Sequence, residues 1–146
     1  MDVSLILTRI AAAVNDAELL GNTLKVAALD YMPSSPEVPM FYPYSFRASY
    51  DKTFGGLVEL STTWHLVVSR SDDDAAYEEA TKLVGTGEGT IRAALIAARG
   101  EPSPSPTALG GAADDIHLIA SSGPTDVALG EVHLLVVQFD LQVIGN

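Results

Sequence analysis

The chain of 146 residues contains no cysteine, which excludes disulfide bonds, thiolate metal ligands and a cysteine nucleophile. Its apolar runs are far shorter than the roughly 20 residues that a membrane-spanning helix requires. The segment that starts at Met1 lacks the basic stretch that precedes the apolar part of a signal peptide. We therefore expect a protein that is not bound to membranes and is not secreted by the general route.

Positive charge is scarce as well. There are 8 Lys and Arg residues against 19 Asp and Glu residues, which gives a formal net charge of −11. Affinity for nucleic acid rests largely on Lys and Arg replacing counterions, so this balance argues against a protein that grips phosphate backbones. An acidic wall repels DNA, however, and so suits a conduit through which DNA passes without binding.

Length and hydropathy predict one domain that covers residues 1–146, because 47% of the residues are apolar and can form a core. The spacing of Ile6, Ile10 and Val14 predicts a helix over residues 3–14, with Asp2 at its positive end. A short strand over 24–29 follows. The prolines after it predict an extended connection, and they are Pro33, Pro36, Pro39 and Pro43.

The middle of the chain predicts a β-hairpin. In its first strand, Tyr42, Tyr44 and Phe46 alternate with polar residues and predict a buried face. In its second strand, Leu60 to Val68, every second residue predicts another buried face. The remaining expected elements are helices over 71–84 and 91–99, a proline linker over 101–106, strands over 114–119 and 131–144, and a turn at Gly123–Pro124. This order predicts an α+β fold, a small and mostly antiparallel sheet flanked by helices.

Three patterns could carry chemistry, and each has a structural explanation. Asp72 to Asp74 could bind a divalent cation, but acids directly after the potential cap Ser71 also favour a helix start. The glycines from Gly85 to Gly89 follow a helix rather than a strand, which does not fit a phosphate loop. The three histidines lack helical zinc-site spacing, and they are His65, His117 and His133. The sequence lacks the Gly-x-Ser-x-Gly motif that is typical of many serine hydrolases.

Five aromatic residues cluster at the start of the hairpin, at positions 41, 42, 44, 46 and 50. They could stack on single-stranded nucleic acid, but such a platform needs basic residues around it. Only Arg47 and Lys52 are near. Core packing or a protein–protein surface is the better interpretation, because tyrosine is enriched in both.

The order of these features resembles the tail terminator proteins of long-tailed (siphovirus-type) bacteriophages, especially those of actinobacterial phages. The resemblance rests on an N-terminal helix, a strand ending in Leu29-Asp30-Tyr31-Met32-Pro33, a proline-rich segment and the hairpin loop from Tyr50 to Gly56. It continues through Val67 to Asp72, a helix pair, Leu109-Gly110-Gly111 and a closing strand from Val136 to Ile144. The Pro-Ser-Pro-Ser-Pro insertion before Leu109 departs from the family pattern.

The resemblance implies a structural virion protein at the head–tail junction, made in the cytoplasm of the bacterial host, with no enzymatic activity, cofactor or metal. Such proteins form a hexameric ring on the head-proximal end of the tail tube. The ring stops tube polymerisation and docks the head–tail connector, while DNA passes through its lumen without specific binding. The partners implied are further copies of the chain, the tail tube protein and the connector or stopper protein.

For contacts with these partners we predict the hairpin loop, because binding residues often lie on loops held by a rigid scaffold. The predicted interface residues are Tyr50, Asp51, Lys52, Thr53 and Phe54. Phe54 could instead fold back onto its own sheet. Two alternative functions stay open: a head–tail stopper or another tail-completion protein, and a small metal-dependent hydrolase that uses Asp72 to Asp74 with His65.

Overall fold

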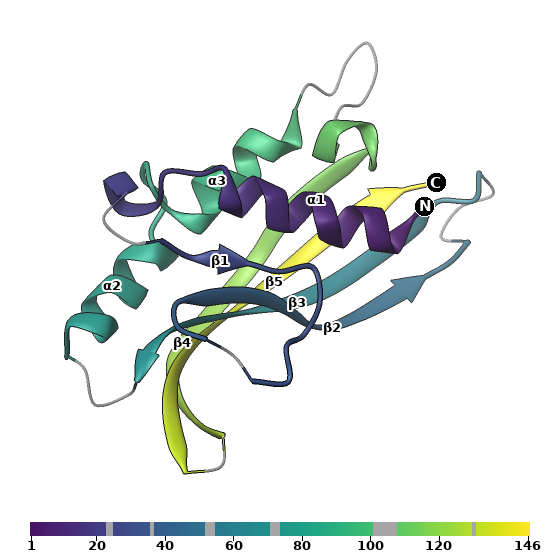
Figure 1. Ribbon diagram of the computed structural model, residues 1–146. Helices are drawn as coiled ribbons and strands as arrows, with labels where there is room; N and C mark the ends of the chain where they lie inside the picture. The colour runs from purple at the N-terminus through teal and green to yellow at the C-terminus, as the bar shows by residue number, and fades with distance from the viewer. Residues whose placement is uncertain (23–24, 36, 52–54, 71–73, 101–107, 130) are drawn as a thin grey trace.

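The computed structural model describes the chain except residues 23–24, 36, 52–54, 71–73, 101–107 and 130. Within the described part, three α-helices pack on one face of a five-stranded sheet, an α+β architecture (Figure 1). The helices are α1 (Val3–Asn15), α2 (Asp74–Val84) and α3 (Ile91–Arg99), and short 3₁₀ turns lie at Leu19–Asn22 and Ala108–Gly111. The strands are β1 (Ala27–Ala28), β2 (Met40–Ser49), β3 (Val58–Arg70), β4 (Asp115–Leu129) and β5 (Val132–Gly145).

Helix α1 forms where its apolar spacing predicts. The Asp2 side chain caps it by accepting a hydrogen bond from the Leu5 backbone N–H over 3.1 Å. Ile6, Ile10 and Val14 are buried against the sheet. The predicted helix over residues 3–14 is confirmed.

The predicted helix over residues 91–99 is also confirmed, and a side chain caps its start as in α1. The Thr90 hydroxyl accepts a hydrogen bond from the Ala93 N–H over 3.2 Å, and Gly100 ends the helix with a φ of 67°. Helix α2 begins at Asp74 in the structure, and the proposed cap at Ser71 lies outside the described residues. No helix within the described residues is long and apolar enough to cross a lipid bilayer.

The sheet has the strand order β1-β2-β3-β5-β4. Strands β2, β3, β5 and β4 pair antiparallel with their neighbours, whereas β1 pairs parallel with β2. The expected mostly antiparallel sheet is therefore wrong, and the sheet is mixed. The physical reason is the connection over residues 29–39, which is long enough to return the chain to its starting end instead of reversing it in a tight turn. Strand β1 is also much shorter than the predicted strand over 24–29.

The core lies between the helices and one face of the sheet. Leu60, Trp64 and Leu66 of β3 are fully buried there, as the alternating pattern predicts. The Trp64 ring stacks on Phe41 with centroids 4.7 Å apart, and Phe139 of β5 packs edge-on against Phe41. This aromatic group joins the three middle strands under the helical layer.

The predicted buried face of β2 is wrong in part. Tyr42 is buried, but Tyr44 and Phe46 are 56% and 58% exposed. The pairing of β2 with β3 shifts between Pro43 and Ser45, so one extra residue moves the side chains that follow to other positions. A bulge of this kind breaks the strict alternation on which the prediction rests.

The predicted turn at Gly123–Pro124 is wrong too, because both residues lie within β4. The ladder with β5 accommodates them by a register shift between Ser122 and Thr125, and the chain reverses only between Leu129 and Val132. Gly123 has a φ of 109°, and a Cβ there would lie 2.8 Å from the Val136 carbonyl oxygen. Only glycine fits this bulge, so the signal that predicted a turn reflects a bulge.

Candidate assembly surface

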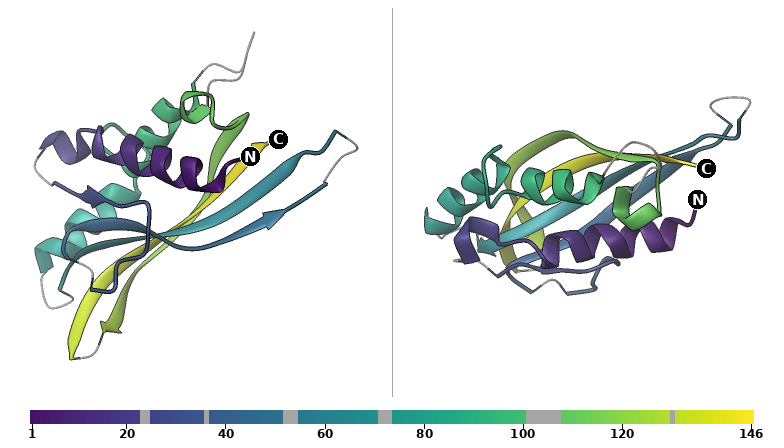
Figure 2. Two further views of the ribbon diagram at one scale, coloured as in Figure 1. Left: turned by 45° about the vertical axis from the view of Figure 1, so that its right-hand side comes forward. Right: turned by 90° about the horizontal axis from the view of Figure 1, so that it is seen from above.

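Two of the predicted interface residues, Tyr50 and Asp51, directly follow β2 in the β2–β3 hairpin, which projects from the body of the molecule (Figure 2). Tyr50 is 71% exposed, and Asp51 is exposed with a φ of 55°. Lys52, Thr53 and Phe54 lie outside the described residues. The structure thus places the first two residues where a partner can reach them, and the role of Phe54 stays a prediction.

Three exposed aromatic side chains follow one another along this hairpin, from Tyr44 and Phe46 on β2 to Tyr50 just beyond it. The other two aromatic residues of the cluster, Phe41 and Tyr42, are buried. The cluster is therefore divided between the core and the surface. Sequence alternation alone did not reveal this division, because Tyr44 lies on the same face as the buried Tyr42 and the two differ in what covers them.

The second face of the sheet, opposite the helices, carries a polar network. The Thr63 hydroxyl donates to Asp140 Oδ1 over 3.1 Å, and the Gln138 amide donates to the same oxygen over 3.2 Å. We call this the uncovered face and define it by Thr63, His65, Gln138 and Asp140. The polar residues fit a solvated or hydrogen-bonded surface. The same face also carries a second, smaller buried apolar cluster, made of Met40, Tyr42, Val67, Leu134 and Val136.

His65 stands on the uncovered face and stacks on Tyr44, with ring centroids 4.1 Å apart and planes 9° apart. Burial lowers the pKa of His65 below its ordinary value, and a hydrogen bond with Gln138 acts in the opposite direction. The imidazole is therefore more easily kept neutral than a solvated one. It serves as a platform for Tyr44.

At the edge of the sheet, Arg99 of α3 forms a bidentate ion pair with Asp115 of β4. The Nε–Oδ1 distance is 2.6 Å and the Nη2–Oδ2 distance is 3.0 Å. His117 Nε2 lies 2.9 Å from Asp115 Oδ2. The hydrogen bond from Arg99 is the main cause that lowers the pKa of Asp115 to about 2. The carboxylate is therefore ionised at all ordinary pH values.

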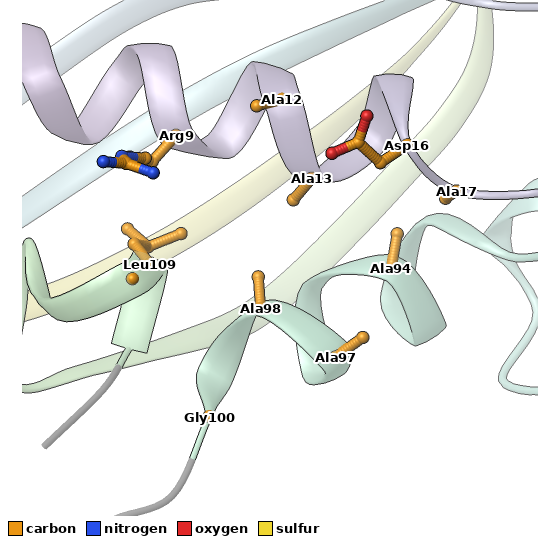
Figure 3. A pocket seen from close by; sticks show the side chains of 11 residues that line it. Arg9, Ala12, Ala13, Asp16, Ala17, Ala94, Ala97, Ala98, Gly100 and Leu109 are labelled. Carbon is orange, nitrogen blue, oxygen red and sulfur yellow. The ribbon is translucent and has the colours of Figure 1, made fainter.

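A groove of about 390 Å³ runs between α1 and α3 (Figure 3). Alanines of both helices line it, and Arg9 and Asp16 lie at opposite ends of the α1 side. The groove exists because the short alanine side chains do not fill the space between the helices. It presents few polar groups and no pair of catalytic side chains.

The described residues do not assemble a site for the metal-dependent hydrolase. Asp72 and Asp73 lie outside the described residues, and within the described residues no three His, Asp or Glu side chains come together as a metal site. The histidines go to separate partners: His65 to Tyr44 and Gln138, His117 to Asp115, and His133 to Asp126 over 3.0 Å. They do not form one cluster.

No known protein-family model matches the chain, and no curated protein matches its sequence.

Proposed function

We propose that this protein is a structural virion protein, the terminator of a phage tail. It forms a hexameric ring at the head-proximal end of the tail tube, stops tube polymerisation and docks the head–tail connector. DNA passes through the ring without specific binding. The protein acts through surfaces rather than through catalysis.

The observation that carries this proposal is the exposure of three aromatic side chains on the projecting hairpin, Tyr44, Phe46 and Tyr50. Aromatic residues are enriched at protein interfaces and supply much of their binding energy. Their display on an extended hairpin supports contact with another subunit or with the tube rather than packing within one chain.

The dimensions of the sheet support the same proposal. Strands β3, β4 and β5 contain 13, 15 and 14 residues, whereas typical strands contain about 5–6. At about 3.4 Å per residue they span roughly 44–51 Å, whereas α1, with 13 residues, spans only about 20 Å. The strand ends extend beyond the helical layer, and such arms suit contacts between neighbours in a ring (Figure 2).

The charge balance agrees with a lumen that DNA crosses. A formal charge of −11 disfavours retention of DNA by electrostatic repulsion. Head-to-tail contacts between identical chains form a closed ring when the rotations from one subunit to the next add up to a full turn. The sheet has helices on one face only, so its two sides present different surfaces, which is compatible with such contacts.

The deciding experiment is removal of the gene from the phage that carries it, followed by electron microscopy of the particles. A terminator predicts overlong tail tubes that are not attached to heads. Tubes of normal length contradict the proposal. Normal tails with filled heads that leak DNA indicate the stopper or another tail-completion protein instead.

A further inference from the structure

The outer edge of β2 is open over most of its length. Strand β1 pairs only with Met40 and Phe41, and within the described residues no strand borders β2 beyond them. Pro43 and the bulge at Tyr44 precede the segment Phe46–Ser49, which is regularly paired with β3 on its other side. A regular edge with free backbone N–H and C=O groups is a template for another strand.

The opposite edge of the sheet is β4. The first residues of β4 lie level with the segment Phe46–Ser49 along the strand direction. Across the ladders, Arg47 aligns with Ser61, then Gln142, then His117, and Ser49 aligns in the same way with Asp115. Three antiparallel pairings separate the two edges, so β2 and β4 run in opposite directions. Rotation about an axis along the strands keeps these heights, and would bring β4 of one copy antiparallel to β2 of the next.

The β4 edge is obstructed at this height. Ile116 points into the core, so its neighbour Asp115 points toward the uncovered face. Arg99 comes from α3 on the helical face and still binds Asp115 through two hydrogen bonds of 2.6 and 3.0 Å. The Arg99 side chain therefore reaches from the helical face to the Asp115 carboxylate beside the first residue of β4. Asp115 Oδ1 also accepts the Ile116 backbone N–H over 2.9 Å, which occupies a donor at this edge.

We propose that the Arg99–Asp115 ion pair is an autoinhibitory contact that keeps β4 of one copy from pairing with the open edge of β2 in a second copy. Free protomers then stay apart, although their two edges match in height and direction. The inference extends the proposed function, since it places ring closure after release of this contact, but the contact acts in the isolated protein and is tested there.

The first test is the oligomeric state of the purified full chain, measured by native mass spectrometry over a range of concentrations. Arg99→Ala removes the obstruction, and Asp115→Asn keeps an acceptor for the Ile116 N–H while it weakens the hold on Arg99. We expect both variants to associate at concentrations about tenfold lower than the parent chain. Arg92→Ala, on an exposed arginine of the same helix, is the matched control and should behave as the parent. Circular dichroism verifies the fold of each variant.

The second test identifies the edges that pair. Because the chain has no cysteine, a disulfide between Arg47→Cys and His117→Cys reports only on the introduced pair. Within one copy these positions are three strand spacings apart, roughly 14 Å, which is too far for a disulfide. Arg47→Cys with Ser122→Cys is the mismatched control, because Ser122 aligns with Tyr42, roughly 17 Å farther along the edge.

We expect the matched pair to form intermolecular disulfides about tenfold faster with Arg99→Ala than with Arg99, and the mismatched pair to form few in either background. Equal rates in the two backgrounds, or equal rates for the two pairs, overturn the inference. So does an Arg99→Ala variant that folds and stays monomeric without cross-links. A parent chain that already forms rings cross-linked at the matched positions also overturns it, while leaving the proposed function to the gene-removal experiment.

Discussion

The side-chain amide of Asn15 pairs with the backbone of Ala28 through two hydrogen bonds, one in each direction. Asn15 Nδ2 donates to the Ala28 carbonyl oxygen and the Ala28 N–H donates to Asn15 Oδ1, both over 2.9 Å. The last residue of α1 thus takes the place of a neighbouring strand for Ala28. It fastens the helix to the short strand β1.

Replacing Asn15 with Asp should destabilise the protein, because a carboxylate oxygen then faces the Ala28 carbonyl in place of a donor. We expect the free energy of unfolding in urea to fall by about 1–3 kcal/mol. Asp16→Asn, at the exposed neighbouring position, is the control. Equal stability of the two variants would show that the amide pair contributes little.

Gly123→Ala should destabilise β4, since the added Cβ would lie 2.8 Å from the Val136 oxygen at a φ of 109°. The expected loss is about 1–3 kcal/mol, measured by thermal or urea unfolding. The matched control is Gly87→Ala, where an added Cβ meets no atom within 4 Å. A harmless Gly123→Ala contradicts the described bulge.

Trp64 is the single tryptophan and is fully buried, with its Nε1 lacking a hydrogen-bond partner within the described residues. Trp64→Ala should lower the free energy of unfolding by about 3–5 kcal/mol, because it leaves a cavity beside Phe41. Trp64→Phe should lose distinctly less, since it keeps a ring against Phe41 and removes the unpaired N–H. Far-UV circular dichroism in urea compares the three proteins, and equal losses in both variants argue against this packing.

The depressed pKa of His65 predicts a pH dependence of stability. Below about pH 6.5 the unfolded chain binds a proton at this histidine before the folded chain does. Stability is therefore fully present above that pH and falls as the pH decreases toward the folded-state pKa. His65→Gln should reduce the change in stability between about pH 7.5 and about pH 5.5. An unchanged pH slope in His65→Gln refutes this origin.

Tyr50→Ser tests the proposed interface without touching the core, because Tyr50 is exposed at the end of the hairpin. Loss of an aromatic anchor should reduce ring formation, or attachment of the protein to tail tubes, by about tenfold or more. The melting temperature should not change. Tyr77→Ser, at another exposed tyrosine on α2, serves as the control. Equal assembly by both variants contradicts a role for the hairpin.

Local signals were sufficient to predict the helices. Asp2 and Thr90 cap α1 and α3 through side-chain oxygens, and Gly100 supplies the backbone conformation that ends α3. These interactions involve residues close in sequence. The buried face of β3 was also predictable, because alternation along an uninterrupted strand fixes which side chains share a face.

The errors arise where distant residues decide the local structure. Gly123 and Pro124 have the composition of a turn, but pairing with β5 holds them within a strand. The parallel pairing of β1 and the bulge at Tyr44 also depend on partner strands. The Arg99–Asp115 contact could not be predicted, because the sequence does not show that β4 is an edge or that α3 ends beside it.

The strand order has a consequence for synthesis of the chain. Strand β5 is made after the other four strands, yet it lies between β3 and β4. On the ribosome, the β2–β3 hairpin can form early, but β4 has no described partner until β5 emerges and inserts between the two halves. The sheet therefore closes in one late, long-range step, in which Val58 meets Gly145, and contacts of such large sequence separation form slowly. Until then the nascent chain exposes the apolar face of β3, a natural point of action for a chaperone.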